Sequence, residues 1–353
     1  MKILLVTSSL DDGGAEKWML DTVCNLDRTD LTIDYYFWEG IKANTFYSLY
    51  EECGVRLYFR NLDKKRTPVW LSLFFDLKRF IQDHGPYDAI HINGTPILLQ
   101  AIALCAIGKG IKVRIVHSHN SLSANLKGLS AVFRSVVRRY VVQNATDVVA
   151  CSELAGREKY GEKVTNDLKF CVLKNGIHLK TFLYGEVLRK KTRDELGLGE
   201  CFTVLHIGRM ANQKNHSFLL DVFSEIVKRE PKAKLLLVGK GEKEKEVFQK
   251  ITCLKLKEKI IHIPWTSEIE KYLSSADVFV LPSLYEGFGT VLLEAQANGL
   301  RCVVSDTVPK ETNVSQKIHF ISLKEPPSFW AEQILLQKGK ARYNCQEELY
   351  TNG

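Results

Sequence analysis

Short runs of β-branched and apolar residues recur along the whole chain, with longer stretches of helix-compatible sequence between them. Strands that alternate with helices pair in parallel, because each helix returns the chain to the same end of the sheet. The runs form two series, so the sequence predicts two doubly wound, Rossmann-like α/β domains in tandem. The first series is Ile3–Val6, Thr32–Phe37, Ala89–Ile92, Val113–Val116, Asp147–Ala150 and Phe170–Leu173. The second series is Thr203–Ile207, Lys234–Val238, Ile260–Ile263, Val278–Leu281 and Cys302–Ser305.

The length of 353 residues suits two domains of ordinary size. Asn175-Gly176 ends the first series and a basic stretch over 188–193 precedes the second, so we expect the linker within residues 174–198. The predicted domains are residues 1–180 and 181–353. Ligands of open parallel sheets bind beyond the carboxyl ends of the strands, so two facing domains would hold a substrate in the cleft between them. A terminal helix that packs back onto the first domain remains an open alternative.

Targeting segments and metal motifs are both missing from the sequence. The apolar run Ile3–Val6 is too short for a signal peptide, and no later stretch approaches the ~20 apolar residues of a membrane-spanning helix. The nine cysteines are scattered, without the CxxC or Cys/His spacing of metal sites. We therefore interpret them as core residues of a cytoplasmic protein that binds no metal.

The formal net charge of +8 is unevenly distributed, because no acidic residue lies between Asp88 and Asp147. A basic face there fits nucleic acid, anionic lipid or a phosphorylated substrate, or is merely solvated. Within it, residues 131–142 read AVFRSVVRRYVV, which suits a helix lying on anionic lipid or one whose valines pack in the core. The sequence has no helix-turn-helix, zinc or RNP-type signature, so no nucleic-acid partner is expected. The basic residues are Lys109, Lys112, Arg114, Lys127, Arg134, Arg138 and Arg139.

The segment over 281–294 reads LPSLYEGFGTVLLE, an apolar strand followed by a glycine-containing turn and a helix. Glycines let a ligand approach the main chain, and the start of a helix favours an anion such as a diphosphate. Two carboxylates there could accept hydrogen bonds from separate hydroxyl groups of one ligand, although two surface acids would show the same spacing. The ligand-binding candidates of this segment are Glu286, Gly287, Phe288, Gly289, Thr290 and Glu294.

A second candidate segment follows the run Thr203–Ile207, where Gly208 ends the strand and Arg209 and Lys214 come after it. Two fixed cations could neutralise a departing diphosphate without a metal ion. Two solvated basic residues are the alternative for this segment taken alone.

In the first domain, polar or glycine residues follow two of the predicted strands. Gly13-Gly14 is neither a GxGxxG fingerprint nor a Walker loop, which disfavours dinucleotide and ATP binding, but Gly14 could let a donor pass close to the main chain. His117 and His119 follow the run Val113–Val116 and therefore fall at the carboxyl end of the sheet. We expect one of the two histidines to be functional, with His119 the candidate, and the other to be structural.

Together these segments resemble family 4 of the retaining nucleotide-sugar glycosyltransferases, particularly bacterial members that build capsular polysaccharide and exopolysaccharide. The likeness runs nearly end to end, and its most specific part is the E-x7-E pattern of Glu286 and Glu294. The sequence departs from the usual pattern at His178 and Arg301, to which we assign no chemistry. The other segments that carry the resemblance are Gly13–Glu16, Val116–Asn120, Asn175–Ile177, Gly208-Arg209 with Lys214, and Val238–Glu242.

The resemblance implies a role for each matched residue. Arg209 and Lys214 would hold the donor diphosphate, Glu294 the ribose and Glu286 the transferred sugar. The main chain of Gly14 would contact the phosphate or sugar, and His119 would lie beside the sugar and the acceptor. The implied catalytic residues are His119, Arg209, Lys214 and Glu286. The implied donor-binding set adds Gly14, Gly208, Gly239, Gly287, Phe288, Gly289, Thr290 and Glu294.

The resemblance also implies a GT-B fold and a retaining hexosyltransferase without metal or cofactor. Its donor would be a nucleotide diphosphate sugar, expected to be a UDP-sugar, and its acceptor lipid-linked or a saccharide, as in capsule and exopolysaccharide synthesis. The family often docks its basic first domain on the inner membrane leaflet. A nucleotide-sugar 2-epimerase or a sugar phosphorylase of the same fold, and a basic nucleic-acid-binding protein, are the alternatives.

Overall fold

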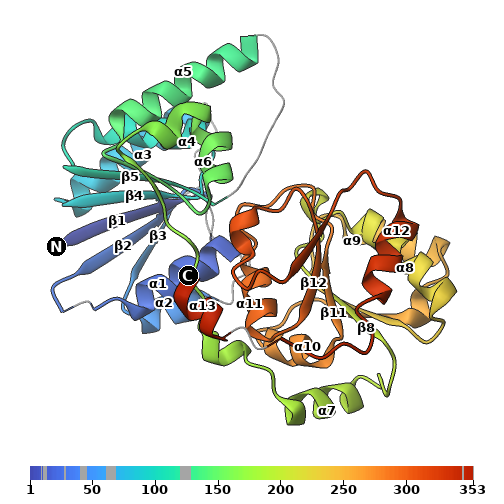
Figure 1. Cartoon of the computed structure of the whole chain (residues 1–353). Helices are drawn as coiled ribbons and strands as arrows, with labels where there is room; N and C mark the ends of the chain where they lie inside the picture. The colour runs from blue at the N-terminus through green and yellow to red at the C-terminus, as the bar shows by residue number, and fades with distance from the viewer. Residues whose placement is uncertain are drawn as a thin grey trace. The chain divides into compact units, whose positions relative to one another are not determined.

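The computed structural model describes residues 1–8, 10, 14–27, 29–39, 46–60, 69–119, 129–343 and 346–352. The chain divides into two compact units, Met1–Asn175 and Gly176–Gly353, which Figure 1 shows in blue to green and in green to red. Each unit has its own parallel sheet and its own hydrophobic core. The segment expected to be a linker lies mostly in the second unit, where residues 186–195 form a helix.

The first unit contains a seven-stranded parallel sheet in the order β3-β2-β1-β4-β5-β6-β7. The chain turns back at β1, which has β2 on one side and β4 on the other, so the topological switch point lies between β1 and β4. The strands are β1 (Lys2–Thr7), β2 (Thr32–Phe37), β3 (Arg56–Phe59), β4 (Ala89–Asn93), β5 (Val113–Ser118), β6 (Asp147–Ala150) and β7 (Phe170–Val172). The helices are α1 (Gly14–Asn25), α2 (Tyr47–Glu52), α3 (Val69–His84), α4 (Ile97–Ile107), α5 (Leu129–Asn144), α6 (Glu153–Tyr160) and η1 (Glu162–Asn166).

The second unit repeats this topology with a six-stranded parallel sheet, in the order β10-β9-β8-β11-β12-β13. Its switch point lies between β8 and β11. The strands are β8 (Thr203–Ile207), β9 (Lys234–Val238), β10 (Ile260–Ile263), β11 (Val278–Leu281), β12 (Arg301–Ser305) and β13 (Ile318–Ile321). The α-helices are α7 (Glu186–Glu195), α8 (His216–Arg229), α9 (Glu244–Cys253), α10 (Ile269–Ser275), α11 (Thr290–Ala297), α12 (Pro327–Leu335) and α13 (Gln346–Asn352). The 3₁₀ turns are η2 (Leu179–Phe182), η3 (Asn212–Lys214), η4 (Lys257–Lys259) and η5 (Lys310–Thr312).

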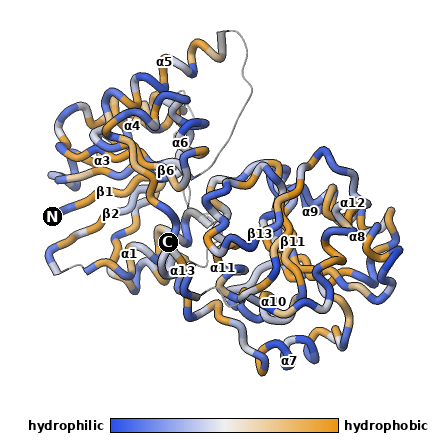
Figure 2. The backbone as a smooth tube through the Cα atoms, viewed as in Figure 1, coloured by the Kyte–Doolittle hydropathy of each residue, from blue (hydrophilic) through white to orange (hydrophobic). Residues whose placement is uncertain are grey.

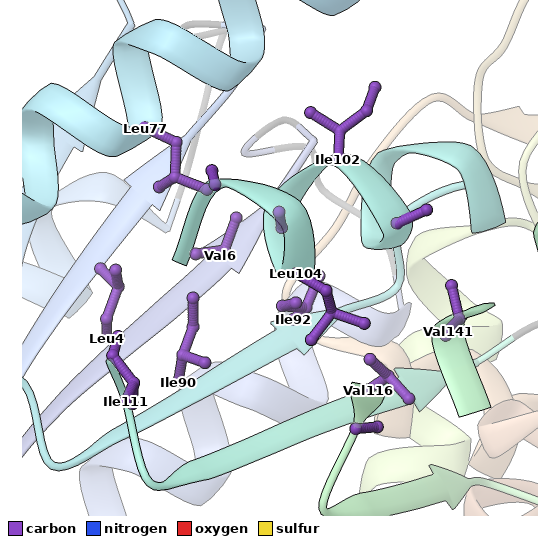
Figure 3. Packing of buried hydrophobic residues seen from close by; sticks show 14 of the residues in the cluster. Leu4, Val6, Leu77, Ile90, Ile92, Ile102, Leu104, Ile111, Val116 and Val141 are labelled. Carbon is purple, nitrogen blue, oxygen red and sulfur yellow. The ribbon is translucent and has the colours of Figure 1, made fainter. Parts of the chain in front are cut away.

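The cores follow from the alternation of side chains along each strand. In β1, Leu4 and Val6 pack under α3 and α4 on one face, whereas Leu5 packs with α1 on the other. Figure 3 shows the first of these faces, where Leu104 lies close to Ile92. Strands buried on both faces carry nearly continuous apolar sequence, which is why β1 and β11 are largely orange in Figure 2.

Every strand predicted from the sequence is present, with ends that differ by one or two residues at most. The prediction missed β3 and β13, which both lie at the edge of their sheets. An edge strand buries less surface, and β3 reads RLYF without a continuous apolar run. The expected GT-B arrangement of two doubly wound domains is confirmed at the level of each domain.

The interpretation of all cysteines as core residues is wrong. Cys24 and Cys53 form a disulfide that links the end of α1 to the residue after α2. Cys105, Cys171 and Cys253 are exposed, and Cys151 and Cys302 are the buried ones among the described residues. The error arose because sequence spacing cannot show which distant cysteines the fold brings together.

Helix α5 has valines on two opposite faces, and the expected packing of valines in the core holds for one of them. Val137 and Val141 are buried in the core, whereas Val132, Phe133 and Val136 are 63%, 59% and 62% exposed. In the described parts of the chain, no helix is both long and apolar enough to span a bilayer. The helix is therefore amphipathic and leaves an apolar face uncovered within its own unit.

Candidate active site

The second unit brings its predicted site residues together at the switch point. Strands β8 and β11 are neighbours in the sheet, so the turns that follow their carboxyl ends meet. The main-chain N–H of Leu284, after β11, donates to the carbonyl of Gln213, after β8, at 2.8 Å. This bond fixes the turn that carries Lys214 against the turn that carries Glu286.

Lys214 and Glu286 form a largely buried ion pair in this place. The Lys214 Nζ lies 2.7 Å from Glu286 Oε1, and the two side chains are 15% and 5% exposed. The aliphatic part of Lys214 passes over Gly208, where an added Cβ would lie 3.0 Å from its Cδ and Cε. Gly208 therefore leaves the room in which the lysine side chain reaches the carboxylate.

Two uncharged side chains also donate hydrogen bonds to Glu286. Ser283 donates from Oγ to Glu286 Oε1 at 2.6 Å, and Gln213 donates from Nε2 to Oε2 at 3.2 Å. The carbonyl of Ser283 in turn accepts from the hydroxyls of Ser305 and Thr307, each at 2.6 Å. The carboxylate is thus held from both oxygens by donors that belong to the sheet end itself.

The turn after Glu286 leads directly into α11. Gly289 precedes the helix with φ +78°, a left-handed conformation that glycine adopts without strain, and Thr290 is the first helical residue. Phe288 and Glu294 are 2% and 4% exposed. The alternative of two surface acids is excluded, because Glu286 and Glu294 are both buried.

Gly239 and Arg209 both lie next to Gly208. Gly239 follows β9 with φ +131°, and an added Cβ would lie 2.2 Å from the carbonyl oxygen of Gly208. Arg209 is exposed, and no side-chain hydrogen bond or ion pair joins it to any other described residue. Of the two predicted cations, Lys214 is therefore engaged with Glu286, whereas Arg209 is available to an anion.

The first unit places a cluster of neutral aromatic residues at its own switch point. His119 Nε2 lies 2.6 Å from Asn93 Oδ1, at the end of β4. His117, which is inside β5, lies 4.0 Å from the His119 ring and 3.2 Å from His91 Nε2 through its Nδ1. Trp18 of α1 packs against both His117 and His119, with ring centroids 5.2 and 5.1 Å away.

Burial keeps these histidines uncharged. It lowers the pKa of His91 to about 4 and, together with the charges of His91 and Lys159, lowers the pKa of His119 to about 3. The pKa of His117 is lowered well below its usual value for the same reasons. At neutral pH each imidazole therefore retains one lone pair that can accept a proton or a hydrogen bond.

Gly14 begins α1, and an added Cβ would meet no atom within 4 Å of it. Gly13 and Asn120, which belong to the segments of the family resemblance, and Lys127 of the predicted basic face lie outside the described residues.

Sequence reasoning missed four residues that build the two sites. Ser283 and Gln213 hold Glu286, and Asn93 and His91 contact the paired histidines. Ser283, Gln213 and Asn93 follow or end a strand toward the carboxyl edge, which is the signal that could have found them, whereas His91 lies inside β4 and carries no such signal. Among the described residues, no group of three or more His, Cys, Asp or Glu side chains is placed to hold a metal ion.

Solved structures of similar fold exist for the whole chain. The crystal structure of Anabaena Alr3699/HepE in complex with UDP and glucose matches with a TM-score of 0.77 and 20% identity, over 100% of this chain and 92% of that chain. WaaG, a glycosyltransferase involved in lipopolysaccharide biosynthesis, matches with a TM-score of 0.74 and 14% identity, over 99% and 92%. The fold class is that of the two-domain GT-B glycosyltransferases.

Sequence comparisons give the family. The model of glycosyl transferases group 1 matches residues 189–322, and that of the glycosyl transferase 4-like domain matches residues 13–176. Putative glycosyltransferase EpsF of Bacillus subtilis is 29% identical over 94% of this chain and 86% of its own length. An uncharacterized glycosyltransferase of Haemophilus influenzae is 31% identical over 84% and 78%. The chain belongs to the group 1 glycosyltransferases, and it is a glycosyltransferase enzyme.

Proposed function

We propose that this enzyme transfers a hexose or N-acetylhexosamine from a UDP-sugar to a lipid-linked or saccharide acceptor, with retention of anomeric configuration. The single observation that carries the proposal is the buried Lys214–Glu286 pair at the β8/β11 switch point, directly before the glycine-led start of α11. A helix start with adjacent cations suits a diphosphate, and a fixed carboxylate suits sugar hydroxyls.

The relatives support the choice of donor and acceptor. A similar Escherichia coli enzyme is named UDP-Gal:alpha-D-GlcNAc-diphosphoundecaprenol alpha-1,3-galactosyltransferase, with 28% identity over 67% of this chain. The fold relative HepE was crystallised in complex with UDP-glucose. Relatives named for capsular polysaccharide and amylovoran biosynthesis support a role of the proposed reaction in polysaccharide assembly.

The proposed chemistry is a displacement on one face of the sugar. The bond from the anomeric carbon to the donor phosphate oxygen breaks with its electron pair, and the acceptor hydroxyl oxygen bonds to that carbon from the same side. The hydroxyl proton passes to the departing phosphate oxygen, so atoms and charge balance. Arg209 and one of the remaining protons of the Lys214 ammonium would stabilise the negative charge on the leaving diphosphate.

Other residues would orient the two substrates. Glu286 would accept hydrogen bonds from the transferred sugar, and Glu294 from the ribose. The main chain at Gly14 would lie against the phosphate or sugar. His119, neutral and held by Asn93, would contact the sugar and acceptor through its unprotonated nitrogen. Because positioning and fixed charge supply the catalysis, we propose that neither metal nor cofactor is needed, so that activity persists in excess EDTA.

We also propose peripheral contact with an anionic membrane through α5. Its uncovered apolar face, together with exposed Arg139, has the composition of a helix that lies on lipid. Arg134 and Arg138 contribute less than the sequence suggested, because both donate to main-chain carbonyls of α6, at Glu158 and at Lys159. Co-sedimentation with anionic liposomes should therefore fall when Val132 and Phe133 are replaced by serine, and unchanged binding would contradict this contact.

A screen of nucleotide sugars tests the function directly. The true donor should raise the melting temperature of the full chain, because a ligand that binds only the folded state stabilises it. Slow hydrolysis of that donor should accompany binding, and transfer should require an acceptor. Conversion of a nucleotide sugar without any acceptor would indicate the epimerase alternative, and dependence on inorganic phosphate would indicate a phosphorylase.

A further inference from the structure

A lysine in the first unit lies at the carboxyl edge of the sheet without an acidic partner. Lys159 of α6 is partly buried, and its Nζ donates to the carbonyl of Thr95 at 2.5 Å. No carboxylate of the described residues lies within ion-pair distance of this amine. Burial and the neighbouring charge of Arg134 lower its pKa to about 8, so most Lys159 side chains are still charged at neutral pH.

The surroundings of this amine have unused hydrogen-bonding capacity. Thr95 is fully buried, and its Oγ1 has no hydrogen-bond partner among the described residues. The same holds for His119 Nδ1, and an added Cβ on Gly94 would lie 3.8 Å from the His119 ring. One continuous group of residues therefore lies at the carboxyl end of β4. It consists of Lys159, Thr95, Gly94 and His119.

We propose that Lys159 and Thr95 form a phosphate-binding subsite that holds the phosphate or diphosphate group of the acceptor. A buried cation without a carboxylate is costly unless an anion joins it, and a phosphate oxygen can accept hydrogen bonds from both an ammonium and a hydroxyl. The inference rests on the proposed function, because it names the acceptor class of that reaction.

The subsite also fits the position of His119. The Lys159 charge is one of the causes that lower the pKa of His119, so an anion beside Lys159 would offset that effect. An acceptor anchored by its phosphate would bring its hydroxyl end near the histidine. The subsite would thus select acceptors that carry phosphate over neutral saccharides.

Binding of inorganic pyrophosphate to the full chain, in saturating UDP, tests this proposal by calorimetry. Saturating UDP occupies the donor diphosphate site, so the remaining pyrophosphate binding reports the second site. Lys159→Met should weaken that binding about tenfold or more, since it removes a charge-assisted contact, and Lys159→Arg should restore most of it. Thr95→Val should weaken it about threefold.

Lys169→Met is the matched control. Its Nζ also donates to a main-chain carbonyl, that of Ala145, at 3.2 Å, but at the opposite end of the sheet. This variant should bind pyrophosphate like the parent protein. No pyrophosphate binding by the parent in saturating UDP would overturn the subsite while leaving the donor proposal intact. Weaker UDP binding by Lys159→Met would also overturn it, because the lysine would then serve the donor. Failure of UDP itself to bind the parent would instead contradict the proposed function.

Discussion

The two units share one topology and place opposite chemistry at the same point of it. At the β8/β11 switch point, a buried lysine and a buried glutamate form an ion pair. Beside the β1/β4 switch point, the side chains are imidazoles that pack against Trp18 and whose pKa is lowered by burial. The sheet order therefore fixes where a ligand can bind, whereas the few residues after each strand decide what can bind there.

The difference also separates two physical tasks. Ionised groups in a buried site stabilise the charge that develops during a reaction, because electrostatic interactions are stronger there than in water. Neutral imidazoles act on protons and hydroxyl groups. The second unit thus suits the charged donor that we propose, and the first suits the proposed hydroxyl-bearing partner.

Replacing Lys214 by alanine should have the largest effect. The change removes a preorganised cation next to the proposed diphosphate and leaves the buried Glu286 without its counter-ion. A loss on the order of 10² to 10³ in kcat/KM for the donor is expected. Steady-state kinetics with the donor found by the screen measure it.

Lys250→Ala is the control for that experiment. Lys250 forms an ion pair with Asp221 at 2.6 Å between α9 and α8, away from the switch point. Its kcat/KM should match that of the parent. Equal kinetics for the Lys214 variant and the parent would refute the role of Lys214 in charge stabilisation.

The glycines of the two units should respond differently to alanine. Gly239→Ala drives a Cβ to within 2.2 Å of the Gly208 carbonyl oxygen, at a φ of +131°, so it should lower the free energy of unfolding by about 2 kcal/mol or more. At Gly14 an added Cβ meets nothing within 4 Å, so stability should change by less than about 0.5 kcal/mol.

The informative measurement is therefore the activity of the Gly14→Ala variant, together with a urea unfolding curve for each of the two variants. A stable Gly14→Ala enzyme with impaired donor binding would support close approach of the ligand to this main chain. A stable variant with normal binding and kinetics would remove Gly14 from the proposed donor site. That site would then consist of residues of the second unit alone.

Most strands could be predicted from the sequence, because they depend on the local hydrophobic pattern. Lys214 and Glu286 could be predicted as site residues, because each follows the end of a predicted strand. Glu286 and Lys214 were both identified, but their direct contact was not, since they lie far apart in the chain and meet only through the pairing of β8 with β11. The pairing of Cys24 with Cys53 was missed for the same reason. Ser283 was overlooked because a serine before a motif looks like an ordinary turn residue.

Removing the Ser283 hydroxyl should have a smaller effect than removing the lysine. Ser283→Ala deletes one of the donors to Glu286 Oε1, which leaves Lys214 in place but lets the carboxylate rotate. A hydrogen bond to a charged group suggests about a tenfold loss in kcat/KM. Ser283→Thr keeps the hydroxyl and should recover most of this loss. Failure of threonine to recover activity, with unchanged melting temperature, would contradict the positioning role.

The smallest effect concerns acid stability in the first unit. His91 has a pKa of about 4 in the folded chain and an ordinary value near 6.5 when unfolded. The unfolded state then binds more protons between these two values, so the free energy of unfolding decreases as the pH falls through this window. From about pH 7 to about pH 5.5, one such histidine accounts for a loss of about 1 kcal/mol.

His91→Phe keeps an aromatic ring beside His117 and removes the titrating group. The free energy of unfolding of this variant, measured with urea, should therefore decrease by about 1 kcal/mol less than that of the parent over the same pH interval. His319→Gln, on the exposed side of β13, serves as the control and should leave the pH dependence unchanged. An identical pH dependence in His91→Phe and the parent would mean that His91 is not buried in its neutral form. The contrast between a neutral first site and an ionised second site would then lose one of its supports, although the Lys214–Glu286 pair would be unaffected.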